Sequence, residues 1–214
     1  MLRSMRKREP IAVINPMSAA FEAYRVLRTN IEFSARRMGL TAIMITSALP
    51  GEGKSTVAAN VAIAYARANR RVLLLDANLR TPALHRMFGV PNDIGLSSLL
   101  DERGDLDEAI RSTSVDNLWL IGSGPIPPNP PELLGSASMA ELLRAAKEMF
   151  DIVFVDTPPL LSVTDALEVA GQCDGALLVL RAGKVSPDAA LKAKACLARS
   201  NTTLIGAVLN GAGR

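Results

Sequence analysis

The segment Ser47-Ala-Leu-Pro-Gly-Glu-Gly-Lys-Ser-Thr56 follows an apolar run, Ala42 to Thr46, and leads into an alanine-rich helical stretch. A strand, a glycine-rich turn and a helix in this order present backbone N–H groups and the positive end of a helix to phosphate. Lys54 is placed to reach the β- and γ-phosphate oxygens, Ser55 to coordinate magnesium and Thr56 to bond a phosphate oxygen. The pattern predicts a P-loop that binds ATP and Mg2+, rather than a turn without a ligand. The residues expected to contact the nucleotide are Pro50, Gly51, Glu52, Gly53, Lys54, Ser55 and Thr56.

The rest of the sequence alternates between short apolar runs and helical stretches. Several runs are continuously apolar, which is typical of parallel strands covered on both faces. The alternation predicts an α/β fold with a doubly wound, mostly parallel sheet, and no linker divides residues 1–214 into two domains. The expected strands are Ala42–Thr46, Arg71–Leu75, Leu118–Ile121, Ile152–Val155, Ala176–Leu180 and Leu204–Leu209. The expected helices are Ala19–Arg37, Ser55–Ala68, Met139–Met149, Asp165–Ala170 and Asp188–Ser200, and Gly122–Pro131 is expected to be a rigid surface loop.

Charge and composition exclude several classes of function. A formal net charge of +3 gives no strong field for nucleic acid, so no nucleic-acid partner is expected. No stretch approaches the ~20 apolar residues that span a bilayer, and the basic start of the chain lacks the apolar part of a secretory signal. We therefore expect a cytoplasmic protein whose residues 1–16 form a basic tail, either solvated or drawn to anionic lipid. Cys173 and Cys196 are expected to be reduced, and His85, the only histidine, cannot build a metal cluster alone.

Two of the expected strands end in an aspartate. Asp76 follows the run Leu73 to Leu75, and Asp156 follows the run Ile152 to Val155. Because ligands gather at the carboxyl ends of parallel strands, both carboxylates should face the P-loop. A carboxylate at that place holds the magnesium shell or orients an attacking hydroxyl. We therefore expect Ser55, Asp76 and Asp156 to organise magnesium, and Lys54, Asp76 and Asp156 to be catalytic. Asp156 corresponds to the Walker B residue, and Asp76 is an additional carboxylate that suits activation of a protein hydroxyl.

A helix is expected before the first strand, over residues 17–38. Glu22, Arg25 and Arg28 recur on it at intervals of three residues, which places them on one side of the helix. The spacing alone leaves two interpretations open. The three side chains form either a solvated, self-paired charged face or a contact with another subunit.

Taken together, these motifs resemble the bacterial tyrosine kinases, a family of P-loop NTPases of the deviant Walker type that controls capsule and exopolysaccharide export. The resemblance rests on the P-loop, on Leu73 to Arg80, on Val155-Asp-Thr-Pro-Pro159, on Glu22-Ala-Tyr-Arg25-Val-Leu-Arg28 and on Asn129-Pro-Pro-Glu132-Leu-Leu134. It implies transfer of the γ-phosphoryl group of ATP to tyrosine, with Asp76 as base or orienter for the tyrosine hydroxyl. It also implies a ring of subunits joined through Glu22, Arg25 and Arg28. Asn210, after the last strand, is a candidate for adenine recognition.

The resemblance also implies where such a protein works. Kinases of this family act with a transmembrane partner of the polysaccharide export system, at the inner face of the cell membrane. The chain departs from the family pattern at Asn78, because the second Walker-like motif usually reads Asp-x-Asp and here reads Asp76-Ala-Asn78. An amide carries no charge and cannot accept a proton. The only tyrosines are Tyr24 and Tyr65, whereas autokinases of the family carry a tyrosine cluster near the C-terminus. The phosphorylated tyrosine is then expected on another protein or on a segment beyond Arg214.

Two alternatives to a kinase are considered, and the departures from the family pattern support the first of them. The first is an ATP-binding scaffold of weak or absent kinase activity, which controls assembly of the export complex. The second is a partition-type ATPase. That second alternative is disfavoured because Leu49 occupies the place of the signature lysine of the cell-division and plasmid-partition ATPases. The P-loop also carries Ala48 at the position of the first glycine of the standard pattern.

Overall fold

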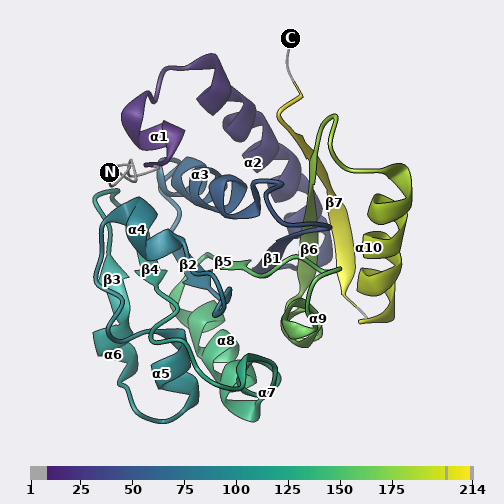
Figure 1. The fold of residues 1–214 in the computed structure, drawn as a ribbon. Helices are drawn as coiled ribbons and strands as arrows, with labels where there is room; N and C mark the ends of the chain where they lie inside the picture. The colour runs from purple at the N-terminus through teal and green to yellow at the C-terminus, as the bar shows by residue number, and fades with distance from the viewer. Residues whose placement is uncertain (1–8, 201, 213–214) are drawn as a thin grey trace, which may run out of the picture.

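The computed structural model describes residues 9–200 and 202–212 and contains one seven-stranded sheet, with helices against both faces (Figure 1). The strands lie in the order β3-β4-β2-β5-β1-β6-β7. All neighbouring strands are parallel except β3 and β4, which are antiparallel. This arrangement confirms the predicted doubly wound α/β fold. The strands are β1 (Ala42–Ser47), β2 (Val72–Asp76), β3 (Ile110–Ser112), β4 (Leu118–Ile121), β5 (Ile152–Asp156), β6 (Gly175–Arg181) and β7 (Thr203–Asn210).

Ten helices, counted within the described residues, form two layers. One layer consists of α1 (Ile11–Ile14), α2 (Ala19–Met38), α3 (Lys54–Ala66) and α4 (Leu84–Phe88). The other consists of α5 (Leu96–Leu100), α6 (Leu106–Ala109), α7 (Pro130–Leu134), α8 (Ala137–Met149), α9 (Asp165–Ala170) and α10 (Pro187–Arg199). Within residues 9–200 and 202–212, none of these helices combines the length and the apolar character that crossing a bilayer requires.

The sheet separates two apolar cores, and the central strands contribute to both. In β2, Leu73 and Leu75 pack with α5 and the helices that follow it, whereas Val72 and Leu74 pack with α1–α4. Successive side chains of a strand point to opposite faces, so a strand covered on both faces needs apolar residues at every position. The two cores therefore explain why the strands are continuous apolar runs in the sequence.

The helix α2 begins where its sequence allows a cap. The hydroxyl of Ser18 accepts a hydrogen bond from the backbone N–H of Phe21 at 3.1 Å, and Gly39 ends the helix in a left-handed conformation. Phe21 and Ile31 are buried against α3 and the sheet. The helix thus lies within the predicted residues 17–38, and its far side faces solvent (Figure 1).

Several expectations need correction. Gly122, Ser123 and Gly124 are buried rather than part of a surface loop, because the start of α5 pairs with them through Leu96 N–H and Ser97 N–H. The following helix begins at Pro130, one residue before the expected Pro131. The basic tail expected over residues 1–16 overlaps a helix in the described part of the chain. Residues 1–8 lie outside the described part of the chain, whereas residues 11–14 form α1, where Ala12 is fully buried and bonds the Asn60 side chain.

The sequence did not predict the antiparallel strand β3 or the short helices α1 and α4–α6. Each of them has three to five residues. Elements of that length carry little periodicity and are held mainly by tertiary packing.

The central core predicts a large difference between buried and exposed substitutions. Phe154 on β5 is fully buried and makes an edge-to-face contact with Tyr65 at 5.2 Å between ring centroids. We expect Phe154→Ala to lower the free energy of unfolding by about 3–5 kcal/mol, through lost transfer energy and the cavity left behind. Leu191→Ala on α10, where the leucine is 65% exposed, should change it by less than about 0.5 kcal/mol. Denaturant unfolding measures both values, and equal losses would contradict the assignment of the core.

Candidate active site

The P-loop connects the end of β1 at Ser47 to the start of α3 at Lys54. Gly51 and Gly53 have φ angles of 79° and 94°, in the region that favours glycine. A Cβ atom on Gly53 would also lie 2.1 Å from Nδ2 of Asn210. The second glycine of the loop is therefore required both by its backbone conformation and by the close approach of the last strand.

Glu52 holds the P-loop in place from within the protein. Its side chain is buried, and its carboxylate accepts hydrogen bonds from the backbone N–H groups of Leu49 at 2.8 Å and Arg181 at 3.2 Å. Its carbonyl oxygen accepts a hydrogen bond from the Asn210 amide at 2.8 Å. The ends of β6 and β7 are thereby attached to the loop. Asn210, predicted from the sequence to recognise adenine, lies directly on the P-loop backbone.

Lys54, Ser55 and Asp156 lie together at the start of α3. The Lys54 ammonium group donates a hydrogen bond to Ser55 Oγ at 3.0 Å and lies 3.8 Å from Asp156 Oδ1. Asp156 is fully buried, and neither carboxylate oxygen has a hydrogen-bond partner within the described residues. Burial raises the pKa of Asp156, and the charge of Lys54 opposes that shift. Buried polar atoms are normally bonded, so these two oxygens fit the ligand shell of a magnesium ion.

Asp76 is the second buried carboxylate of the site. The parallel pairing of β2 and β5 places it opposite Asp156. Its Oδ2 atom accepts hydrogen bonds from Ala83 N–H at 3.1 Å and Leu84 N–H at 3.0 Å, and its Oδ1 atom accepts one from Asn78 N–H at 3.2 Å. Burial and the neighbouring charge of Asp156 raise the pKa of Asp76 to about 7. A divalent cation near the pair would offset both effects, so the donor set of Ser55, Asp76 and Asp156 suits magnesium.

Asn78 is buried, and its side chain is bonded to Thr81 in the same loop. Its Nδ2 group donates to the Thr81 carbonyl oxygen at 3.1 Å, and its Oδ1 atom accepts from Thr81 N–H at 3.3 Å and from Thr81 Oγ1 at 3.2 Å. An ionised aspartate cannot donate the first of these bonds. The residue that departs from the family motif therefore stabilises the loop that begins at Asp76.

Two further residues of the region emerged only from the structure. Arg80, which the sequence left without a role, forms two hydrogen bonds with Asp165 at the start of α9, at 2.8 and 3.0 Å. Asp165 was predicted only as the first residue of a helix. The segment Thr157-Pro-Pro159 lies against β1, since Thr46 Oγ1 donates to the Pro158 carbonyl oxygen at 2.9 Å. An acidic residue shortly after the Thr-Pro-Pro motif was the only sequence signal for Asp165.

The three charged residues of α2 do not share one environment. Glu22 and Arg25 are exposed and paired with each other at 3.0 Å. Arg28 is half-buried and turns toward α3, where it donates to the Ala64 carbonyl oxygen at 3.4 Å. Self-pairing thus occurs for Glu22 and Arg25, and both lie on the outer surface of α2, where another subunit could reach them.

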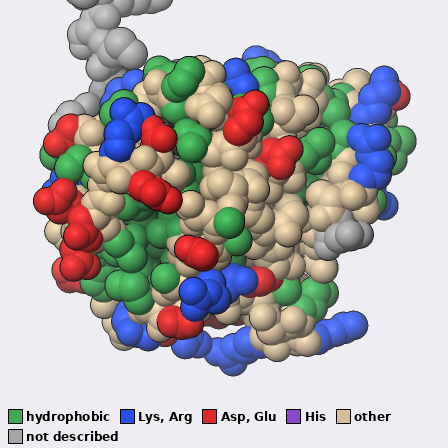
Figure 2. Space-filling model, turned by 90° about the horizontal axis from the view of Figure 1, so that it is seen from below, with side chains coloured by type: hydrophobic (Ala, Val, Ile, Leu, Met, Phe, Trp, Pro, Cys, Tyr) green, Lys and Arg blue, Asp and Glu red, His purple; other side chains and the backbone are tan. Residues whose placement is uncertain are grey.

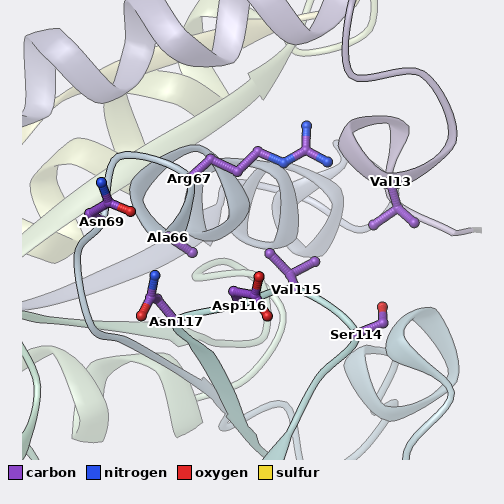
Figure 3. A pocket seen from close by; sticks show the side chains of 8 residues that line it. All are labelled: Val13, Ala66, Arg67, Asn69, Ser114, Val115, Asp116 and Asn117. Carbon is purple, nitrogen blue, oxygen red and sulfur yellow. The ribbon is translucent and has the colours of Figure 1, made fainter.

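A cavity of about 400 Å³ lies at the opposite end of the sheet (Figure 3). Its walls come from the end of α3 and from the turn before β4, whose Asn117 carbonyl oxygen bonds the first residue of β2. It is lined by Val13, Ala66, Arg67, Asn69, Ser114, Val115, Asp116 and Asn117. Since Asp76 ends β2 at the other edge, this cavity is separate from the P-loop site. On the face drawn in Figure 2, acidic and basic side chains are interspersed, and several of them lie side by side.

The fold and the P-loop with its two strand-end aspartates define a P-loop NTPase. The family described as ParA, NUBPL iron-transfer P-loop NTPase, matches residues 40–213. Tyrosine-protein kinase YwqD of Bacillus subtilis is 44% identical over 208 residues, which cover 97% of this chain and 88% of the relative. The kinase domain of Escherichia coli tyrosine kinase ETK superposes with a TM-score of 0.92 at 37% identity, over 98% of this chain and 82% of that domain.

The chimerical protein CapA2B2 is a further structural relative, with a TM-score of 0.91 and 38% identity over 95% of this chain and 90% of that chain. The cell-division ATPase MinD of Pyrococcus furiosus superposes less well, with a TM-score of 0.71 and 28% identity over 81% of this chain and 73% of its own. The chain belongs to the bacterial tyrosine-protein kinases, as its motifs indicated. Its homology supports kinase chemistry over the partition-type alternative.

The buried aspartate pair predicts a pH dependence of stability. The pKa of Asp76 rises from 3.8 to about 7 on folding, so between these values the folded chain binds more protons than the unfolded one. The contribution of Asp76 to the free energy of unfolding is therefore most favourable below pH 3.8 and is lost as pH rises through 7. Asp76→Asn should remove this contribution. In denaturant unfolding without nucleotide or metal, the free energy of unfolding of the variant should therefore increase relative to that of the unsubstituted protein as the pH rises from 3.8 to about 7. A constant difference at every pH would contradict the assignment.

Proposed function

We propose that this kinase domain transfers the γ-phosphoryl group of ATP to a tyrosine, with Lys54, Asp76 and Asp156 as its catalytic residues. The observation that carries the proposal is the pair of buried carboxylates, Asp76 and Asp156, beside the P-loop lysine. Asp156 Oδ1 lies 3.8 Å from Lys54 Nζ. Lys54 would neutralise charge on the transferred phosphoryl group. Pro50 to Thr56 would enclose the phosphates, and Asn210 would border the nucleotide through its bond to the loop. Catalysis of this kind depends mainly on positioning and electrostatics.

Ser55, Asp76 and Asp156 would hold magnesium, which supplies charge neutralisation between the β- and γ-phosphates when it is bound. Asp76 would also orient the tyrosine hydroxyl and accept its proton as the phenolic oxygen bonds to the γ-phosphorus. The bond to the oxygen that bridges the β- and γ-phosphates breaks, and ADP leaves. Asp76 Oδ1 accepts only one hydrogen bond from the described residues and retains a lone pair.

The acceptor tyrosine would belong to another chain or segment. Tyr65 is buried, and burial raises the pKa of its hydroxyl, as it does for the half-buried Tyr24. By its family, the domain would work at the inner face of the cell membrane, with a transmembrane partner of the polysaccharide export system. The relatives named CapB and CpsD, together with the CapA2B2 chimera, support a role in capsule or exopolysaccharide synthesis.

The charge of Lys54 gives the first test of this function. Methionine has an unbranched side chain of similar length but no charge. Lys54→Met should therefore lower tyrosine phosphorylation about a hundredfold or more. The matched control is Lys194→Met on the exposed side of α10, which should retain activity. Phosphotyrosine is measured by mass spectrometry on the cytoplasmic segment of the membrane partner with ATP and Mg2+. Equal activity of the two variants would contradict the assigned role.

The uncharged Asn78 favours a second candidate function, an ATP-binding scaffold with little or no kinase activity. This scaffold would control assembly of the export complex through its nucleotide state. The two functions separate in the same assay, because a scaffold binds ATP and forms ATP-dependent oligomers without phosphorylating the partner.

We also propose that Glu22, Arg25 and Arg28 join subunits into a ring, as the family motif implies. The exposure of the Glu22–Arg25 pair on the outer side of α2 supports this proposal. Arg25→Ala should shift the protein from oligomers to monomers in sedimentation velocity with ATP, because it removes a charge-assisted contact between subunits. Arg144→Ala is the matched control, since Arg144 forms a similar exposed pair with Glu148 on α8. Unchanged oligomers of Arg25→Ala would contradict the interface.

A further inference from the structure

Arg80 and Asp165 connect the loop that follows β2 with the segment that follows β5. Arg80 Nε donates to Asp165 Oδ2 at 2.8 Å, and Arg80 Nη2 donates to Asp165 Oδ1 at 3.0 Å. The Asp165 side chain is fully buried, whereas that of Arg80 is 43% exposed. A buried carboxylate needs a charged partner with good geometry, and the planar guanidinium group supplies two parallel hydrogen bonds.

The loop that carries Arg80 also determines the position of the Asp76 carboxylate. This loop leaves β2 after Asp76 and returns to it, since Ala83 N–H and Leu84 N–H both donate to Asp76 Oδ2. The bonds between Asn78 and Thr81 fix its middle part. A displacement of the loop would therefore move the N–H groups that orient Asp76.

The segment that carries Asp165 is attached to the P-loop at its other end. After Asp156 it contacts β1 and the P-loop, because Leu160 N–H donates to the Ser47 carbonyl oxygen at 2.9 Å and Leu161 N–H to that of Ala48 at 3.3 Å. Asp165 then begins α9. The ion pair with Arg80 thus joins this segment to the loop after β2. Asp76 and Asp156, the proposed magnesium ligands, lie where the two joined segments leave the sheet.

We propose that Arg80 is a positioning residue that holds the loop after β2 against the segment after β5, and thereby fixes Asp76 relative to Asp156 for magnesium binding. The inference rests on the proposed function for its effect on phosphorylation. Two hydrogen bonds of the Arg80 guanidinium group are directed at Asp165, so Arg80 acts on the site through this contact. Residues that orient metal ligands typically change metal affinity or activity by about 10- to 100-fold when they are replaced.

The test measures the Mg2+ concentration that half-saturates binding of a fluorescent ATP analogue, together with kcat and KM for phosphorylation. Arg80→Ala and Asp165→Asn should each raise the half-saturating Mg2+ concentration about tenfold and lower kcat more than they change KM. The double variant should show no further change, because both residues act through one contact. Arg80→Lys keeps the charge but loses the paired hydrogen bonds. Its half-saturating Mg2+ concentration should lie between that of the unsubstituted protein and that of Arg80→Ala.

Arg71→Ala is the matched control. Arg71 precedes β2 and pairs with Asp151 at 3.3 Å, at the end of the strand away from the site. Its Mg2+ dependence should equal that of the unsubstituted protein. An unchanged half-saturating Mg2+ concentration in Arg80→Lys and Asp165→Asn would overturn the inference, even if these variants were less thermally stable. Additive increases of that concentration in the double variant would overturn it as well. If the unsubstituted protein transfers no phosphate, the proposed function fails, whereas Mg2+-dependent binding of the analogue still decides the role of Arg80.

Discussion

The parallel pairing of β2 with β5 places Asp76 opposite Asp156, and the chemistry of the site depends on this register. Two carboxylates held side by side in the interior repel each other and lose hydration, and both effects favour the protonated acid. Lys54 offsets only part of this cost, since its ammonium group lies 3.8 Å from Asp156 and bonds Ser55. The folded domain therefore contains an electrostatic arrangement that a divalent cation would stabilise. ATP bound with a magnesium ion would bring that cation together with phosphates at the P-loop.

The sequence was sufficient for the parts of the site that are built from local patterns. A strand, a glycine-rich turn and a helix define the P-loop within a short stretch, and continuous apolar runs define the central strands. The rule that carboxyl ends of parallel strands share one edge then placed Asp76 and Asp156 near Lys54. The structure confirms that proximity, although the metal and catalytic roles of these residues stay predictions.

Features built from contacts between distant segments could not be predicted in this way. Arg80 and Asp165 are separated by 85 positions, and neither has a local pattern that identifies its partner. The burial of Gly122 to Gly124 likewise depends on α5 approaching their backbone, where a Cβ atom on Gly95 would lie 2.3 Å from Gly124 N. Turn-forming residues indicate a loop correctly but do not tell whether another segment covers it. The short strand β3 follows the same logic, because its pairing with β4 supplies the stability that three residues lack alone.

Asn78 illustrates how a change of charge and a change of structure can oppose each other. An aspartate at position 78 would add a third buried carboxylate to the loop that begins at Asp76, and it would increase the repulsion among buried acids. Asparagine avoids that repulsion, and its amide gains a hydrogen bond to the Thr81 carbonyl oxygen that an ionised acid cannot make. This hydrogen bond stabilises the loop that orients Asp76. Compared with the Asp-x-Asp form of the motif, the site of this chain has one carboxylate fewer and a loop with an additional hydrogen bond. The position of Asp76 then depends on this loop, which Arg80 attaches to the start of α9.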